Sequence, residues 1–136
     1  MRNNLVGLTI AMTLILLPLH PGARAQNSGY YTLDQATAGA DIYQAKCASC
    51  HGAQMEGYIG PSLRGHAFQV ITSRQTDAGR LLLIISRNEP ENNPGALSED
   101  EDANVLAYIL QVNGYPAGKE KLSAESSHLR ELNLNR

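Results

Sequence analysis

Apolar positions recur with a helical period in three stretches of this chain, and the first stretch begins at Thr32. Gln35 follows three residues later, which is the spacing of a capping box. Ala36, Gly39 and Tyr43 continue at three- and four-residue intervals, so the pattern predicts a helix that runs directly into position 47. Because glycine lowers helix propensity, Gly39 indicates close packing against another element.

The second stretch runs from Thr76 to Ile85 and is mostly apolar. Its consecutive Leu and Ile residues also suit a buried strand, but the chain offers no second convincing strand to pair with it. We therefore predict a short helix here, with Thr76 or Ser73 as its N-cap.

The third stretch gives the clearest helix. Ser98-Glu-Asp-Glu101 is a capping box with acidic residues in the first turn, where the helix dipole favours them. Apolar residues follow at helical intervals as far as Val112, and Asn113-Gly114 then ends the helix.

Two regions lack a helical period. From Gly52 to Gly65 the chain is rich in Gly and Pro, which predicts a loop. Beyond residue 116 it is largely polar, with at most one amphipathic turn through Leu129 and Leu132. Together with the three helices, this organisation predicts an all-α domain with long loops.

The N-terminus has the pattern of an export signal. Arg2 precedes an apolar run from Leu5 to Leu19, and Ala23-Arg-Ala25 has the small-x-small form of a cleavage site. The run of about 15 residues is shorter than the roughly 20 that a membrane span needs. We expect a signal peptide at 1–25, cleaved after Ala25, and one domain at 26–136 in the periplasm without stable membrane insertion. An uncleaved anchor is the alternative.

The expected domain is slightly acidic and poor in large side chains. Without Arg2 and Arg24 it has 9 basic residues against 13 acidic ones, and the basic residues are scattered, which argues against a nucleic-acid partner. It contains one Phe, six Tyr and no Trp. A core this small is marginal alone, so a bound cofactor would help to fill it.

The only two cysteines lie in the pentapeptide Cys47-Ala-Ser-Cys-His51. A redox disulfide would require a βαβ context, which the pattern does not predict. A zinc site would require two further ligands, and His66 and His128 lie far away without a partner motif. In C-x-x-C-H, by contrast, two thiols attach haem and the histidine binds its iron. The motif favours one haem c, covalent through Cys47 and Cys50, with disulfide and zinc as alternatives.

After residue 25 the chain resembles the class I c-type cytochromes over most of its length. The resemblance rests on Gly39 and Tyr43, on CASCHG, on GPSLRG from Gly60 to Gly65, and on VLAYIL from Val105 to Leu110. It implies a small cytochrome c fold, in which several short helices wrap around one covalent haem and the N- and C-terminal helices cross.

The same resemblance implies roles for individual residues. His51 would be the axial iron ligand. Pro61 would direct its carbonyl toward the other ring nitrogen of His51, a bond that orients the ligand and raises its basicity. Gly39, Tyr43 and Tyr108 would form the contact where the two helices cross.

The family usually supplies a methionine on the opposite face of the haem, often as Met-Pro, but Glu89-Pro90 stands in that place here. Glu89 is therefore our tentative distal ligand. Met55, His66 and His128 are alternatives, as is a sixth position that holds water or hydroxide or stays open. An anionic carboxylate would favour ferric iron and lower the reduction potential, whereas a neutral thioether raises it.

The resemblance implies a periplasmic electron carrier that is not an enzyme. Its partners would be other redox proteins, docked weakly at the haem edge. A periplasmic dehydrogenase is one such partner, because residues 97–122 are similar to the ends of small cytochromes that serve quinoprotein dehydrogenases. The missing methionine leaves two alternatives, which are binding or sensing of a small gas and weak peroxidase activity with Glu89 or a nearby histidine as acid–base group.

Overall fold

The computed structural model describes residues 29–73 and 77–123, together with residues 125, 129, 132 and 134. The expected signal peptide and its cleavage site lie outside these residues. The elements are five helices: Leu33–Lys46 (α1), Ala48–His51 (α2), Gly65–Thr72 (α3), Ala78–Asn88 (α4) and Glu99–Val112 (α5). No β-strand occurs in the described part of the chain, so the predicted all-α class is confirmed.

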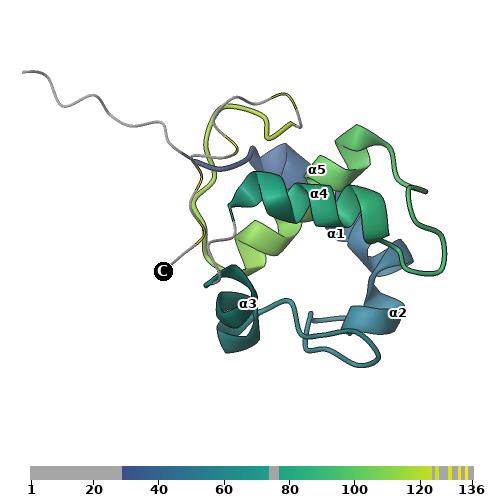
Figure 1. The fold of residues 1–136 in the computed structure, drawn as a ribbon. Coiled ribbons are helices and arrows are strands. Elements are labelled where there is room, and N and C mark those ends of the chain that lie inside the picture. Colours follow the sequence, from purple (N-terminus) through teal and green to yellow (C-terminus); the bar gives the residue numbers. More distant parts are fainter. Residues whose placement is uncertain are drawn as a thin grey trace, which may run out of the picture.

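The first and last helices cross, as predicted (Figure 1). Thr32 and Ser98 cap them, each in a complete capping box. At the crossing, a Cβ atom on Gly39 would lie 1.8 Å from the carbonyl oxygen of Asn104, so only glycine permits this approach. Beside it the rings of Tyr43 and Tyr108 meet edge to face, with centroids 5.6 Å apart.

The apolar stretch after residue 76 forms α4, which confirms a helix rather than a strand. Its predicted cap was wrong. Asp77 is the N-cap, because its carboxylate accepts a 2.7 Å hydrogen bond from the backbone N–H of Arg80. Ser73 instead ends α3, a helix that the sequence pattern did not predict. Phe68 and Thr72 of α3 are buried, and this packing stabilises a segment with little helical signal of its own.

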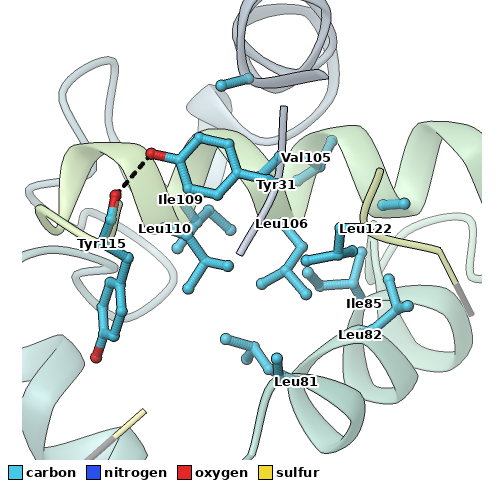
Figure 2. Close-up of a cluster of buried hydrophobic side chains, with 14 of the residues drawn as sticks. Tyr31, Leu81, Leu82, Ile85, Val105, Leu106, Ile109, Leu110, Tyr115 and Leu122 are labelled. Carbon is cyan, nitrogen blue, oxygen red and sulfur yellow. Dashed lines mark hydrogen bonds between the residues drawn. The ribbon is translucent and has the colours of Figure 1, made fainter. Parts of the chain in front are cut away.

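A cluster of buried apolar side chains lies between α5 and α4 (Figure 2). Leu106 and Leu110 of α5 are fully buried, and Ile85 of α4 lies on the Leu106 side of the cluster. The hydroxyl of Tyr31, from the segment before α1, closes one end by donating to the carbonyl of Tyr115 at 2.8 Å.

The chain after α5 returns across the molecule and adds to this core. Gln35 of α1 exchanges two buried hydrogen bonds with the backbone of Leu122, at 2.7 and 2.9 Å. The carbonyls of Leu132 and Leu129 accept from Ala78 and Gly79, the first two residues of α4. These bonds satisfy N–H groups that have no partner within their own helix. The predicted turn through Leu129 and Leu132 includes residues outside the described set.

Candidate functional site

The two cysteines lie where α1 meets α2. Cys47 ends α1 and begins α2, because its N–H donates to Tyr43 at 2.8 Å and its carbonyl accepts from His51 at 3.0 Å. Both Cys47 and Cys50 are half-buried free thiols rather than a disulfide. The hydroxyl of Tyr43 donates to the carbonyl of Gly52 at 2.7 Å, which ties the motif to the long helix α1.

His51 presents a single open ring nitrogen. Its side chain is buried, with 8% of its surface exposed, and Nδ1 lies 2.8 Å from the carbonyl oxygen of Pro61. A carbonyl can only accept, so this contact corresponds to the tautomer with the proton on Nδ1. Nε2 then carries the lone pair that can bind a metal.

The loop from residue 52 to 64 is bonded directly to the motif. Gly57 donates to the carbonyl of His51 at 2.7 Å, and Gly60 donates to that of Cys50 at 2.9 Å. A Cβ atom on Gly60 would lie 2.7 Å from Cε1 of His51. The loop backbone therefore passes directly against the imidazole, and a side chain at residue 60 would displace the ring.

The three alternative ligands are placed very differently. Met55 is 1% exposed in the loop that also carries Pro61, and its carbonyl accepts from Leu63 at 3.0 Å. It is thus a buried residue of the same loop as Pro61. His66 is exposed in the first turn of α3. His128 lies outside the described residues.

Glu89 is the C-cap residue of α4. It ends α4, where its N–H donates to Ile85 at 3.0 Å, and its side chain is half-buried. The fold brings it close to the motif. Burial, the charge of Glu89 and the charge of Cys50 together raise the pKa of the free Cys47 thiol to about 11. The free thiol is therefore neutral at ordinary pH.

These side chains fit a covalent haem better than the alternatives. No group of three or more His, Cys, Asp and Glu side chains that could hold a metal ion occurs among the described residues, so the cysteines lack the ligand set of a zinc site there. Two thiols one helical turn apart, followed at once by an oriented imidazole, match the attachment points and the iron ligand that haem c requires.

This fold and this site define a small c-type cytochrome. Residues 34–109 match the family described as cytochrome C oxidase, cbb3-type, subunit III, and the chain belongs to that family. Its cofactor is a single haem c, held covalently through Cys47 and Cys50, and its general activity is electron transfer on that haem.

Similar proteins carry related names. The chain is 35% identical over 74 residues to a cytochrome c-553-like protein of Synechocystis sp., over 54% of this chain and 66% of the relative. It is 32% identical over 84 residues to cytochrome c-551 of Bacillus subtilis, over 62% of this chain and 69% of the relative. The match to the cytochrome bc1 complex cytochrome c subunit of Corynebacterium diphtheriae is 29% identical over 82% of this chain but only 40% of that subunit.

One solved structure has the same fold. The crystal structure of the sulfane dehydrogenase SoxCD from Paracoccus pantotrophus superposes with a TM-score of 0.54 over 76% of this chain and 60% of that one, at 21% identity. The chain thus spans about two thirds, or less, of most of the proteins that it resembles. Among the described residues, no helix is long and apolar enough to cross a membrane.

Sequence reasoning missed one part of the site. Asn113 was predicted only as the end of a helix, yet its side chain bonds to the loop that carries Pro61. Asn-Gly after an apolar run signals a helix end, and nothing in the local sequence indicates a second contact 50 residues away.

Proposed function

We propose that this chain is an exported, periplasmic protein that carries single electrons between other redox proteins. The observation that carries the proposal is the arrangement at α2, where two free thiols and one buried imidazole share a short helix and a backbone carbonyl orients the imidazole. The haem supplies an iron that changes between ferric and ferrous states. The export pattern at residues 1–25 supports the location.

The side chains at α2 have separate tasks in this proposal. Cys47 and Cys50 would hold the haem, and Nε2 of His51 would bind its iron. Pro61 accepts the Nδ1 proton of His51 at 2.8 Å, which fixes the ring orientation and raises the basicity of Nε2. The backbone bonds of the 52–64 loop keep this arrangement nearly unchanged when the charge on the iron changes.

Glu89 is our proposed ligand on the opposite face. It is half-buried at the end of α4 and near Cys47, whereas Met55 belongs to the same loop as Pro61, the hydrogen-bond partner of His51. A carboxylate binds ferric iron better than ferrous iron because its negative charge is better compensated in the oxidised state. We therefore expect a reduction potential below that of a cytochrome with a thioether ligand.

Binding of a small gas is the second candidate function. It is favoured by the position of Met55, which is buried in the same loop as Pro61. In our proposal the distal side then has a weak oxygen ligand rather than a thioether. Such a ligand is easily displaced by carbon monoxide from ferrous iron. A carrier and a sensor differ in their response to the gas, because only a sensor must change its conformation when the gas binds.

The partners in this proposal are redox proteins. Relatives include a subunit of a cytochrome bc1 complex, and the similar solved structure is a sulfane dehydrogenase, so domains of this kind occur within larger redox assemblies. A periplasmic dehydrogenase remains our proposed donor. Exposed Glu99 and Asp100 at the start of α5 would favour a basic rim on the partner.

Cyclic voltammetry of the purified holoprotein at increasing scan rates tests the carrier proposal. A carrier should give a reversible one-electron wave whose peaks stay close together, because the loop at His51 needs little rearrangement. Widely separated peaks, with a change in hydrogen exchange across the described helices when carbon monoxide binds, would overturn the carrier proposal in favour of a gas sensor.

A further inference from the structure

The end of α5 is joined to the loop of the haem site by one side chain, that of Asn113. Its Nδ2 donates to the carbonyl of Leu63 at 2.8 Å and to that of Ile109 at 2.8 Å. Its Oδ1 accepts from the N–H of Gly65 at 3.0 Å. Two carbonyls require the amide nitrogen and an N–H requires the oxygen, so the three bonds define one orientation of this side chain.

Asn113 bonds to Leu63 and Gly65, which follow Pro61, the residue whose carbonyl orients His51. Leu63 lies two residues after Pro61, and its own N–H donates to Met55 at 3.0 Å. Gly65 begins α3 with a positive φ of 60°. The chain between Pro61 and Gly65 is therefore anchored at both of these points, and the position of the Pro61 carbonyl depends on that anchoring.

We propose that Asn113 is a positioning residue that clamps the Pro61 loop to α5 and thereby sets the hydrogen bond on Nδ1 of His51. The inference rests on the proposed ligation of iron by His51. Through that bond, a side chain at the far end of α5 adjusts the basicity of the iron ligand. Loss of the clamp weakens the bond, lowers the basicity of Nε2, and shifts the reduction potential upward.

Ser98→Ala provides a matched control for the Asn113 variants. Ser98 caps the opposite end of the same helix, where its hydroxyl accepts from the N–H of Glu101. Its loss destabilises α5 without contact to the Pro61 loop. A merely structural role for Asn113 would give the same result in both variants.

The test uses the full-length holoprotein in the ferric state with cyanide, which occupies the sixth position and removes differences on the distal side. Hyperfine-shifted proton resonances of His51 report its ligation and the exchange of its Nδ1 proton. In Asn113→Ala we expect that proton to exchange roughly tenfold faster, as for the loss of about one hydrogen bond, and the potential of the cyanide-free protein to rise. Ser98→Ala should lower Tm but leave both values unchanged.

The outcomes separate the clamp from the proposed function. Wild-type protein without His51 resonances would show that the ligation itself is wrong. Resonances that are present but unchanged in Asn113→Ala, with a potential equal to that of wild type and Ser98→Ala, would overturn the clamp alone. Should Asn113→Ala not accumulate as holoprotein, Asn113→Asp keeps the acceptor for Gly65 and removes both N–H donors. It is read from the exchange of the Nδ1 proton alone, because its added negative charge lowers the potential by itself.

Discussion

The two sides of the haem site differ in how they are built. On the His51 side, backbone bonds connect the 52–64 loop to the motif, from Gly57 to His51 at 2.7 Å and from Gly60 to Cys50 at 2.9 Å. On the Glu89 side, the backbone bonds from Asn93 to Pro90 and from Ala96 to Asn93 stay within the segment itself. Residues 91–96 are all exposed.

This difference fits the proposed roles, in which the His51 side keeps the pattern implied by the family resemblance and residue 89 departs from it. A change on the His51 side disturbs bonds to both the motif and α5, so few substitutions preserve the site. A change at residue 89 disturbs little else, because the segment after α4 makes few contacts with the core. In our proposal, the distal ligand is therefore the part of the site that can change while the fold remains the same.

The largest difference is expected in haem content, when the two proposed iron ligands, His51 and Glu89, are removed in turn. His51→Ala should abolish accumulation of haem-containing protein, because the buried site loses its axial ligand and the acceptor at Pro61 loses its donor. Glu89→Ala should accumulate with haem attached. The measurement is covalent haem content by the pyridine haemochrome spectrum, and equal haem loss in the two variants would contradict the contrast.

Two glycine substitutions sharpen the comparison. In Gly60→Ala the new methyl group would lie 2.7 Å from His51 Cε1. We therefore expect the free energy of unfolding to fall by about 1–3 kcal/mol and the reduction potential of the haem to shift. In Gly95→Ala no atom lies within 4 Å of the added Cβ, and only the φ of 74° opposes it, at about 1 kcal/mol. Guanidinium unfolding and potentiometry of the two holoproteins check this. A potential shift in Gly95→Ala as large as in Gly60→Ala would contradict it.

Asp102 of α5 should make the free energy of unfolding depend on pH. It is 3% exposed, Oδ1 has no hydrogen-bond partner among the described residues, and burial followed by the charges of Glu101 and Glu99 raises its pKa from 3.8 to about 6. A raised pKa in the folded state means that protonation stabilises the fold. This contribution is complete below pH 3.8 and is lost as pH rises through about 6.

Asp102→Asn should remove this pH dependence and stabilise the protein near pH 7 by about 1 kcal/mol, a figure discounted for solvent screening. Urea unfolding between pH 4 and pH 7.5 is the measurement. Asn has nearly the same shape, so packing is retained. A variant whose stability falls as steeply with pH as that of the wild type would assign the effect to another group.

The smallest effect is expected when Glu89 is replaced and the free energy of unfolding is measured. Glu89→Gln leaves the backbone bond to Ile85 intact and alters a half-buried side chain. With cyanide in the sixth position, the free energy of unfolding of the ferric holoprotein should therefore change by less than about 0.5 kcal/mol. Urea unfolding of that form measures it. A loss above about 2 kcal/mol would mean that Glu89 has a structural role in the fold itself.

The sequence predicted what depends on short-range patterns. Two capping boxes located α1 and α5, Gly39 indicated their close contact, and the C-x-x-C-H motif indicated haem c. What it missed depends on tertiary contacts. Packing of Phe68 and Thr72 forms α3, Asp77 replaces the predicted caps, and Asn113 reaches the Pro61 loop across 50 residues of chain.

The roles at the iron stay predictions for a related reason. The C-x-x-C-H motif predicts His51 as an iron ligand because the histidine follows the second cysteine directly in sequence. No such adjacency exists for the distal ligand, whose identity depends on how the segment after α4 lies over the haem. Glu89 is brought near Cys47 by the fold, and only a spectrum of the iron can report whether its carboxylate binds.

The most direct test of the account is the ultraviolet–visible spectrum of the holoprotein, ferric and ferrous, with and without carbon monoxide, beside that of Glu89→Met. We predict high-spin ferric iron in the natural protein, carbon monoxide binding to its ferrous form, and a low-spin spectrum with thioether character in Glu89→Met. A low-spin spectrum that the substitution leaves unchanged, and that does not respond to carbon monoxide, would contradict the account, because another residue would then hold the sixth position.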